Sequence, residues 1–134
     1  MAIRVRVEIR GPEGTIVTSA LVNSGYEVPE PEIHLPARLS RQLGLRIVGS
    51  EEYERVGGGV RAEVLGYVDV RVIEPDRTSG WVRARATCVQ GEREVLLSDK
   101  LIDALGIEPI RPGAGLWRFS GEDRLRASVG PQEW

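Results

Sequence analysis

The sequence is poor in the residues that build covalent or metal-linked frameworks. Among its 134 residues it has one cysteine, Cys88, and one histidine, His34. A single cysteine excludes a disulfide within the chain, and one cysteine with one histidine is too few for a Cys/His zinc site. Long apolar runs are also missing, since no stretch approaches the roughly 18 residues that a membrane span needs. The first residues, Met-Ala-Ile-Arg-Val-Arg, lack the apolar core of a secretory signal. We therefore expect a soluble cytoplasmic protein with no membrane partner.

An excess of charge of one sign is absent as well. The chain has 18 Lys and Arg against 20 Asp and Glu, for a net charge of −2, whereas general binding to nucleic acids requires a basic excess. We therefore expect no nucleic-acid partner. With 41% hydrophobic and 28% charged residues, the composition is that of an ordinary folded domain, long enough to bury a core without a structural metal. We expect neither a metal nor a cofactor.

Alternating apolar and polar residues predict strands along much of the chain. The alternation from Ile3 to Arg10 is typical of a strand with one face in water. The turn sequence Gly11-Pro12-Glu13-Gly14 follows, and residues 15–22 are predicted to return as the second strand of a hairpin. Residues 81–89 form another predicted strand, in which Cys88 is a small buried hydrophobe.

A longer hairpin is predicted in the middle of the chain. The even-numbered residues from Val60 to Val72 are apolar except for Gly66, so this stretch is one long strand or two strands joined by a bulge at Gly66. Residues 51–56 precede it. Gly57-Gly58-Gly59 lies between the two segments and predicts a flexible tip.

Helical signals are few and short. Pro36 suits the first turn of a helix that Gly44 ends, and Ser98 can cap a second helix that ends at Gly106. Residues 26–35 are acidic and interrupted by prolines, so we expect no regular structure there.

The two helices lie in similar sequence contexts. Residues 20–25, Ala-Leu-Val-Asn-Ser-Gly, lead after a loop to Leu-x-x-x-Leu-Gly-Leu at residues 39–45. Residues 95–99, Val-Leu-Leu-Ser-Asp, lead directly to Leu-x-x-x-Leu-Gly-Ile at residues 101–107. This self-similarity suggests a pseudo-symmetric β domain, although a strand, a turn and a glycine-stopped helix also occur together elsewhere.

Taken in order, three segments resemble the retroviral-type (retropepsin-like) aspartic peptidases: Leu21-Val22-Asn23-Ser24-Gly25, the hairpin at Gly57-Gly58-Gly59, and Val95-Leu96-Leu97. The resemblance spans about residues 1–110. It implies an all-β fold, a small pseudo-symmetric closed or partly open β-barrel with one or two short helices, over residues 1–112. Residues 113–134 would be a C-terminal extension that is mobile or helps to form a dimer.

The resemblance also implies a function. In this family two subunits each supply one carboxylate, and the pair shares a proton and holds a water in a cleft at the dimer axis. An extended peptide or unfolded protein substrate would lie in that cleft, with Gly57, Gly58 and Gly59 as a substrate-binding lid. Asn23 stands at the catalytic carboxylate position, Ser24 would brace the two loops, and Gly25 would let the two backbones approach.

The asparagine implies that the scaffold is inactive as written, because an amide has no titrating proton and cannot act as a base. A natural asparagine, an inactivating substitution and an asparagine that deamidates all stay open. Three further residues depart from the family pattern: Tyr26, Ser98 and Lys100 stand where a small residue, a glycine and an Asp or Asn are common.

Other interpretations of the same residues also stay open. Asn-Ser-Gly is an ordinary turn sequence, in which case the chain would be a non-catalytic dimeric β module that binds peptides or proteins. A Ser/His/Asp enzyme would have to use His34, and no nucleophile-elbow motif accompanies it. Arg83 and Arg85 beside Trp81 could stack on single-stranded nucleic acid, although a solvated strand face fits the acidic balance better.

Overall fold

The computed structural model describes residues 2–55 and 58–134. In chain order, its elements are β1 (Arg4–Gly11), β2 (Gly14–Val22), β3 (Glu32–His34), α1 (Ala37–Gln42), β4 (Gly49–Arg55), β5 (Gly58–Val72), β6 (Val82–Cys88), β7 (Val95–Leu97), α2 (Asp99–Ala104), β8 (Ile107–Arg111), the 3-10 turn η1 (Pro112–Ala114), β9 (Leu116–Phe119) and β10 (Arg126–Ala127).

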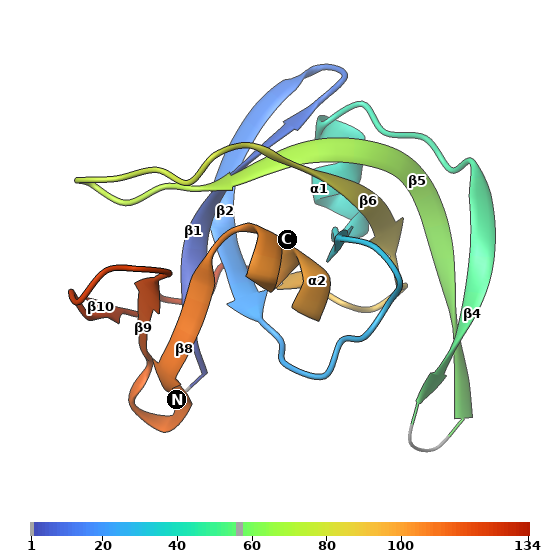
Figure 1. Ribbon diagram of the computed structural model, residues 1–134. Coiled ribbons are helices and arrows are strands. Elements are labelled where there is room, and N and C mark those ends of the chain that lie inside the picture. The colour runs from blue at the N-terminus through green and yellow to red at the C-terminus, as the bar shows by residue number, and fades with distance from the viewer. Residues whose placement is uncertain (1, 56–57) are drawn as a thin grey trace.

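Six of the strands close into a barrel. The main sheet has the strand order β1-β2-β7-β3-β6-β5-β4, and β1 also pairs with β5, from Val7–Val72 to Arg10–Asp69. The long curved β5 passes over the barrel, and its N-terminal part extends away from the barrel as a hairpin with β4 (Figure 1). The prediction of an all-β barrel with two short helices is confirmed.

The first predicted hairpin is confirmed over its whole length. β1 and β2 pair antiparallel from Arg4–Leu21 to Gly11–Gly14. The apolar residues of β1 point inward, since Val5, Val7 and Ile9 are each at most 1% exposed. Burial of an aliphatic side chain of this size stabilises a fold by about 1.5–3 kcal/mol, so the period-two pattern fixes which face of β1 is inside.

The second hairpin and its bulge are confirmed, but the predicted glycine tip is not, because Gly58 and Gly59 are paired strand residues of β5 and Gly57 lies outside the described residues. β4 and β5 pair antiparallel, and the register between β5 and β6 shifts between Val64 and Gly66. Gly66 has a φ of +89°, which a glycine adopts without steric cost. A bulge bends a strand and increases its twist. The bend at Gly66 therefore allows β5 to pair with β4 in the hairpin and with β6 and β1 in the barrel.

Both helices begin and end where the sequence predicts. α1 follows Pro36 and stops before Gly44, which has a φ of +77°. α2 is capped by Ser98, whose Oγ accepts the backbone N–H of Leu101 at 3.2 Å, and it stops before Gly106, which has a φ of +73°. The strands of the two similar sequence units are neighbours, because β2 and β7 pair in parallel.

The expectation of no regular structure in residues 26–35 is wrong at its C-terminal end. There β3 pairs in parallel with β6 and antiparallel with β7, and all three of its residues are buried. The strand exists because both neighbours supply backbone partners that lie more than 50 residues away in sequence. Local composition does not contain that information.

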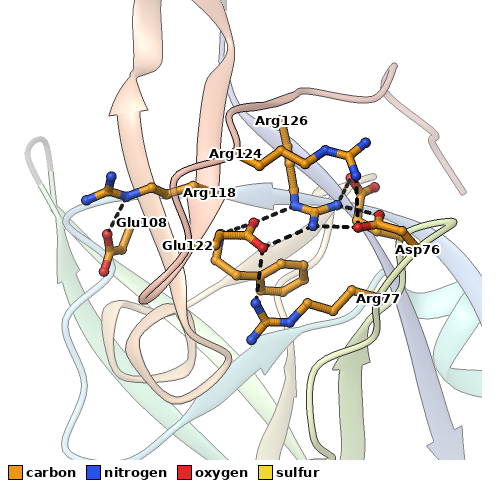
Figure 2. Close-up of polar contacts among 9 residues, drawn as sticks. Asp76, Arg77, Glu108, Arg118, Glu122, Arg124 and Arg126 are labelled. Atoms are coloured by element: carbon orange, nitrogen blue, oxygen red, sulfur yellow. Dashed lines mark hydrogen bonds and ion pairs between the residues drawn. The ribbon is translucent and has the colours of Figure 1, made fainter.

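The C-terminal residues pack against the barrel. β8, β9 and β10 form a second sheet, in which Trp117 and Phe119 are each 1% exposed and meet edge to face with 5.0 Å between ring centroids. Figure 2 shows Arg126 of β10 between carboxylates of Asp76 and Glu122. The boundary at residue 112 and a role of residues 113–134 in a dimer stay predictions.

Candidate functional site

A cleft of about 730 Å³ lies where the loop after β2 meets the β4–β5 hairpin. One wall is the loop, with Asn23, Gly25 and Tyr26, and the opposite wall is the hairpin, with Glu51, Glu52 and Val60. The barrel strands β3, β6 and β7 form the floor through His34, Arg85, Thr87 and Leu96. The cleft therefore brings together the two segments that the sequence singled out.

The Asn-Ser-Gly corner is a tight turn. The backbone N–H of Tyr26 donates to the carbonyl of Asn23 at 3.2 Å, and Gly25 has a φ of +97°. A Cβ at Gly25 would meet nothing within 4 Å, so the backbone conformation is what favours glycine there. Ser24 and Gly25 are exposed, and Asn23 is half-buried.

The start of α2 braces this corner from behind. The carboxylate of Asp99 accepts the backbone N–H of Gly25 at 3.1 Å, and the backbone N–H of Asp99 donates to the carbonyl of Tyr26 at 2.9 Å. These two bonds join the polar turns of the two similar sequence units, so the position of Asn23 depends on both.

Ser98, the residue before Asp99, also connects the start of α2 to the segment that follows the Asn-Ser-Gly corner, and it lies in the interior. It is fully buried, and its Oγ accepts the backbone N–H of Glu32 at 2.9 Å as well as that of Leu101. Its own backbone N–H donates to the carbonyl of Glu32 at 3.0 Å. Ser98 thus works as a helix cap and a strand anchor, which gives a structural reason for a residue that departs from the family pattern.

Charged side chains cross the floor of the cleft. Glu32 has a side chain that is 0% exposed, and it pairs with Arg85 at 3.1 Å. Arg85 also binds the carboxylate of Glu51 through two nitrogens. The phenol of Tyr26 donates to the second oxygen of Glu32 at 2.6 Å. A buried carboxylate is tolerated when it is paired and hydrogen-bonded in this way.

His34 lies on the same floor, at the foot of the cleft. Its Nδ1 is 3.1 Å from the backbone carbonyl of Glu94. Because a carbonyl only accepts, Nδ1 carries the proton in this contact. The hydroxyl of Ser98 is occupied as a cap, so the Ser/His/Asp interpretation gains no nucleophile from that serine.

The predicted site residues fall in three places. Asn23 and Gly25 line the cleft, and Ser24 lies between them in the turn. Gly57 lies outside the described residues. Gly58 and Gly59 open β5 and pair with Arg55 and Glu54, directly before Val60 on the cleft wall.

Sequence reasoning did not find the polar floor of the cleft. Glu32 lies in a segment that looked irregular, and Arg85 looked like one more polar residue of an alternating strand. The only signals for them were an acid in a proline-rich segment and an arginine among the polar residues of an alternating strand. Neither signal indicates that the two side chains meet.

The residues of the nucleic-acid alternative, Trp81, Arg83 and Arg85, each contact other side chains of this chain, and Arg83 lies over the ring of Tyr67. Arg10 and Arg71 lie over the ring of Trp81, and each pairs with a carboxylate, Asp69 and Glu8 respectively. Arg85 lines the cleft.

Within residues 2–55 and 58–134, no group of three or more His, Cys, Asp or Glu is placed to hold a metal ion. Nor does any helix in that part of the chain have the length and apolar character to cross a membrane.

Comparison with known proteins supports the fold. No protein-family model matches the sequence, and no curated protein matches it. Among solved structures, the chain is similar to the retroviral protease-like domain of Ddi1 from Leishmania major, with a TM-score of 0.56 and 12% sequence identity over 97% of both chains. At this identity the likeness concerns the fold alone. The chain therefore has a retropepsin-like fold, with the cleft and the Asn-Ser-Gly corner on it.

Proposed function

We propose that this chain is one subunit of a retropepsin-like homodimer that binds extended peptide segments, and that it does not cleave them. The observation that carries the proposal is the cleft, which has Asn23 and Gly25 on one wall and the β4–β5 hairpin on the other. The retropepsin-like fold supports the same arrangement.

The exposed corner favours a dimer. Ser24 and Gly25 lie at the surface of the single chain, although both sit in a turn that Asp99 holds firmly in place. A second copy related by a two-fold axis could cover this corner with its own, since the surfaces at such an interface are identical. Each cleft would then continue into that of the partner subunit.

The chemistry at the corner explains why we expect no cleavage. A carboxylate dyad needs one ionised and one protonated acid. Two asparagines can hold a water or a carbonyl by hydrogen bonds, but they can neither accept nor release a proton near neutral pH. Peptide binding needs only the cleft and its hydrogen-bonding groups.

The experiment that tests this proposal restores the acid. We expect Asn23→Asp to cleave an unfolded protein between about pH 3 and 7, the range in which carboxylate dyads work. A transition-state-mimic inhibitor should block the cleavage. The unchanged chain and Asn23→Ala serve as controls and should both be inactive.

The second candidate is a non-catalytic dimeric β module, for which the asparagine itself is sufficient. Its support is that Asn23, whose amide can donate and accept hydrogen bonds, lines the cleft. A folded and dimeric Asn23→Asp variant that cleaves nothing but binds unfolded protein would favour this candidate over a peptidase scaffold.

A further inference from the structure

The two walls of the cleft are joined by a chain of polar contacts that the proposed function does not use. It begins at Tyr26 on the loop, whose O–H donates to Glu32 Oε2 at 2.6 Å. It continues from Glu32 Oε1 to Arg85 Nη1 at 3.1 Å. It ends where Arg85 donates from Nη1 and Nη2 to the two carboxylate oxygens of Glu51 on β4.

Burial falls along this chain from the floor outward. The side chain of Glu32 is 0% exposed, that of Arg85 is 19% exposed and that of Glu51 is 42% exposed. An unpaired buried charge is costly, so Arg85 is held firmly on Glu32. Glu51 is the outer member of the chain and can separate from Arg85 at less cost.

The order of the strands shows which elements the contact between Arg85 and Glu51 connects. Glu32 and Arg85 are paired residues on the neighbouring strands β3 and β6, so they start on the same face. β4 is not a neighbour of β6, because β5 lies between them. The contact between Arg85 and Glu51 therefore reaches across β5 and ties the hairpin to the floor of the barrel.

We propose that Arg85 is a positioning residue that holds the β4–β5 hairpin at a fixed distance from the Asn23 loop, through Glu51 on one side and through Glu32 and Tyr26 on the other. The width of the cleft is then set in the free protein, and binding does not have to order the hairpin. The effect on a ligand rests on the proposed function, whereas the positioning itself does not.

The first test measures the free protein by amide hydrogen exchange. Glu51→Gln keeps the shape of the side chain and removes its charge. We expect amide exchange to become about three- to tenfold faster in residues 49–52 and 60–64, because a partly exposed bidentate ion pair contributes modestly to local stability. Exchange in β1 and β2 should not change.

Two further variants make the test specific. Glu52→Gln removes the same charge from the next residue of β4 and should leave exchange in the hairpin within about twofold of the unchanged chain. Arg85→Lys keeps the charge but loses the planar fork, and it should reproduce the effect of Glu51→Gln. Unchanged exchange in Glu51→Gln, or equal acceleration in Glu52→Gln, would overturn the proposal even if Arg85→Lys fails to fold.

The second test concerns binding and separates the two proposals. The probe is reduced, carboxymethylated α-lactalbumin with a fluorescent label, followed by anisotropy. We expect Glu51→Gln to weaken its binding about threefold or more, while Glu13→Gln, in the first hairpin turn, should not change it. If the unchanged chain does not bind the probe, the proposed function fails, and hydrogen exchange still decides the role of Arg85. Equal binding by Glu51→Gln and the unchanged chain would overturn the effect of positioning on the ligand.

Discussion

At the scale of single residues, Arg126 shows how one charge can hold distant segments together. Its side chain is 2% exposed and meets carboxylates of Glu122 at 2.7 Å and Asp76 at 2.8 Å (Figure 2), with Glu74 at 3.2 Å. We expect Arg126→Met to destabilise the fold by about 3 kcal/mol, because carboxylates gathered around a buried cation lose their partner. Urea unfolding measures this loss. Arg124→Met is the control, since Arg124 is 63% exposed and should contribute less than about 1 kcal/mol.

The same cluster predicts how stability depends on acid. Hydrogen bonds from Arg126 lower the pKa of Asp76 from 3.8 to about 2 and that of Glu122 from 4.5 to about 2. Because the unfolded chain binds these protons more readily, the stabilisation is complete above about pH 4.5 and declines as the pH falls toward 2. Melting temperatures measured from pH 6 to pH 2 should follow this curve. A variant carrying both Asp76→Asn and Glu122→Gln should lose less stability over the same interval, and an unchanged slope would contradict the assignment.

At the scale of elements, the glycines that end the two helices act through backbone conformation. Gly106 has a φ of +73°, and a Cβ there would find its nearest neighbour at 3.8 Å, so an added methyl group fits but the backbone is strained. We expect Gly106→Ala to lower the free energy of unfolding by about 1 kcal/mol. Gly130→Ala, where a Cβ has open space and φ is not left-handed, should stay within about 0.5 kcal/mol of the unchanged chain. Thermal or urea unfolding distinguishes the two.

Elements whose pattern is local were predictable from the sequence. The alternation of β1, the bulge at Gly66 and the cap at Ser98 each depend on residues close in the chain, and all three are present. β3 was missed because its partners in β6 and β7 are distant in sequence. The polar floor of the cleft was missed for the same reason, since nothing near Glu32 indicates that Arg85 lies beside it.

At the scale of the whole molecule, the fold was predictable through an ordered set of weak signals, whereas the assembly is not visible in one chain. The Asn-Ser-Gly corner, the glycine hairpin and the second strand–turn–helix unit each occur in many proteins. Their order along the chain led to a retropepsin-like barrel, and the cleft now places the first of them opposite the hairpin. Whether two such corners face one another depends on a partner copy, which no pattern within the chain specifies.

A cysteine placed at the corner tests that arrangement directly. Ser24 is exposed in the turn, and two copies of it would lie close to the two-fold axis of the proposed dimer, within reach of a disulfide between cysteine Cα atoms about 4.4–6.8 Å apart. We therefore expect Ser24→Cys to form a disulfide-linked dimer under mild oxidation, seen on non-reducing gels at micromolar protein.

The native thiol should not interfere, because Cys88 is 7% exposed and burial raises its pKa, which lowers its reactivity. Val17→Cys, at an exposed position of β2, is the matched control and should remain monomeric on the same gel. Equal cross-linking at both positions would mean random collision, and no cross-linking at Ser24 in a chain that sediments as a dimer would place the two-fold axis elsewhere.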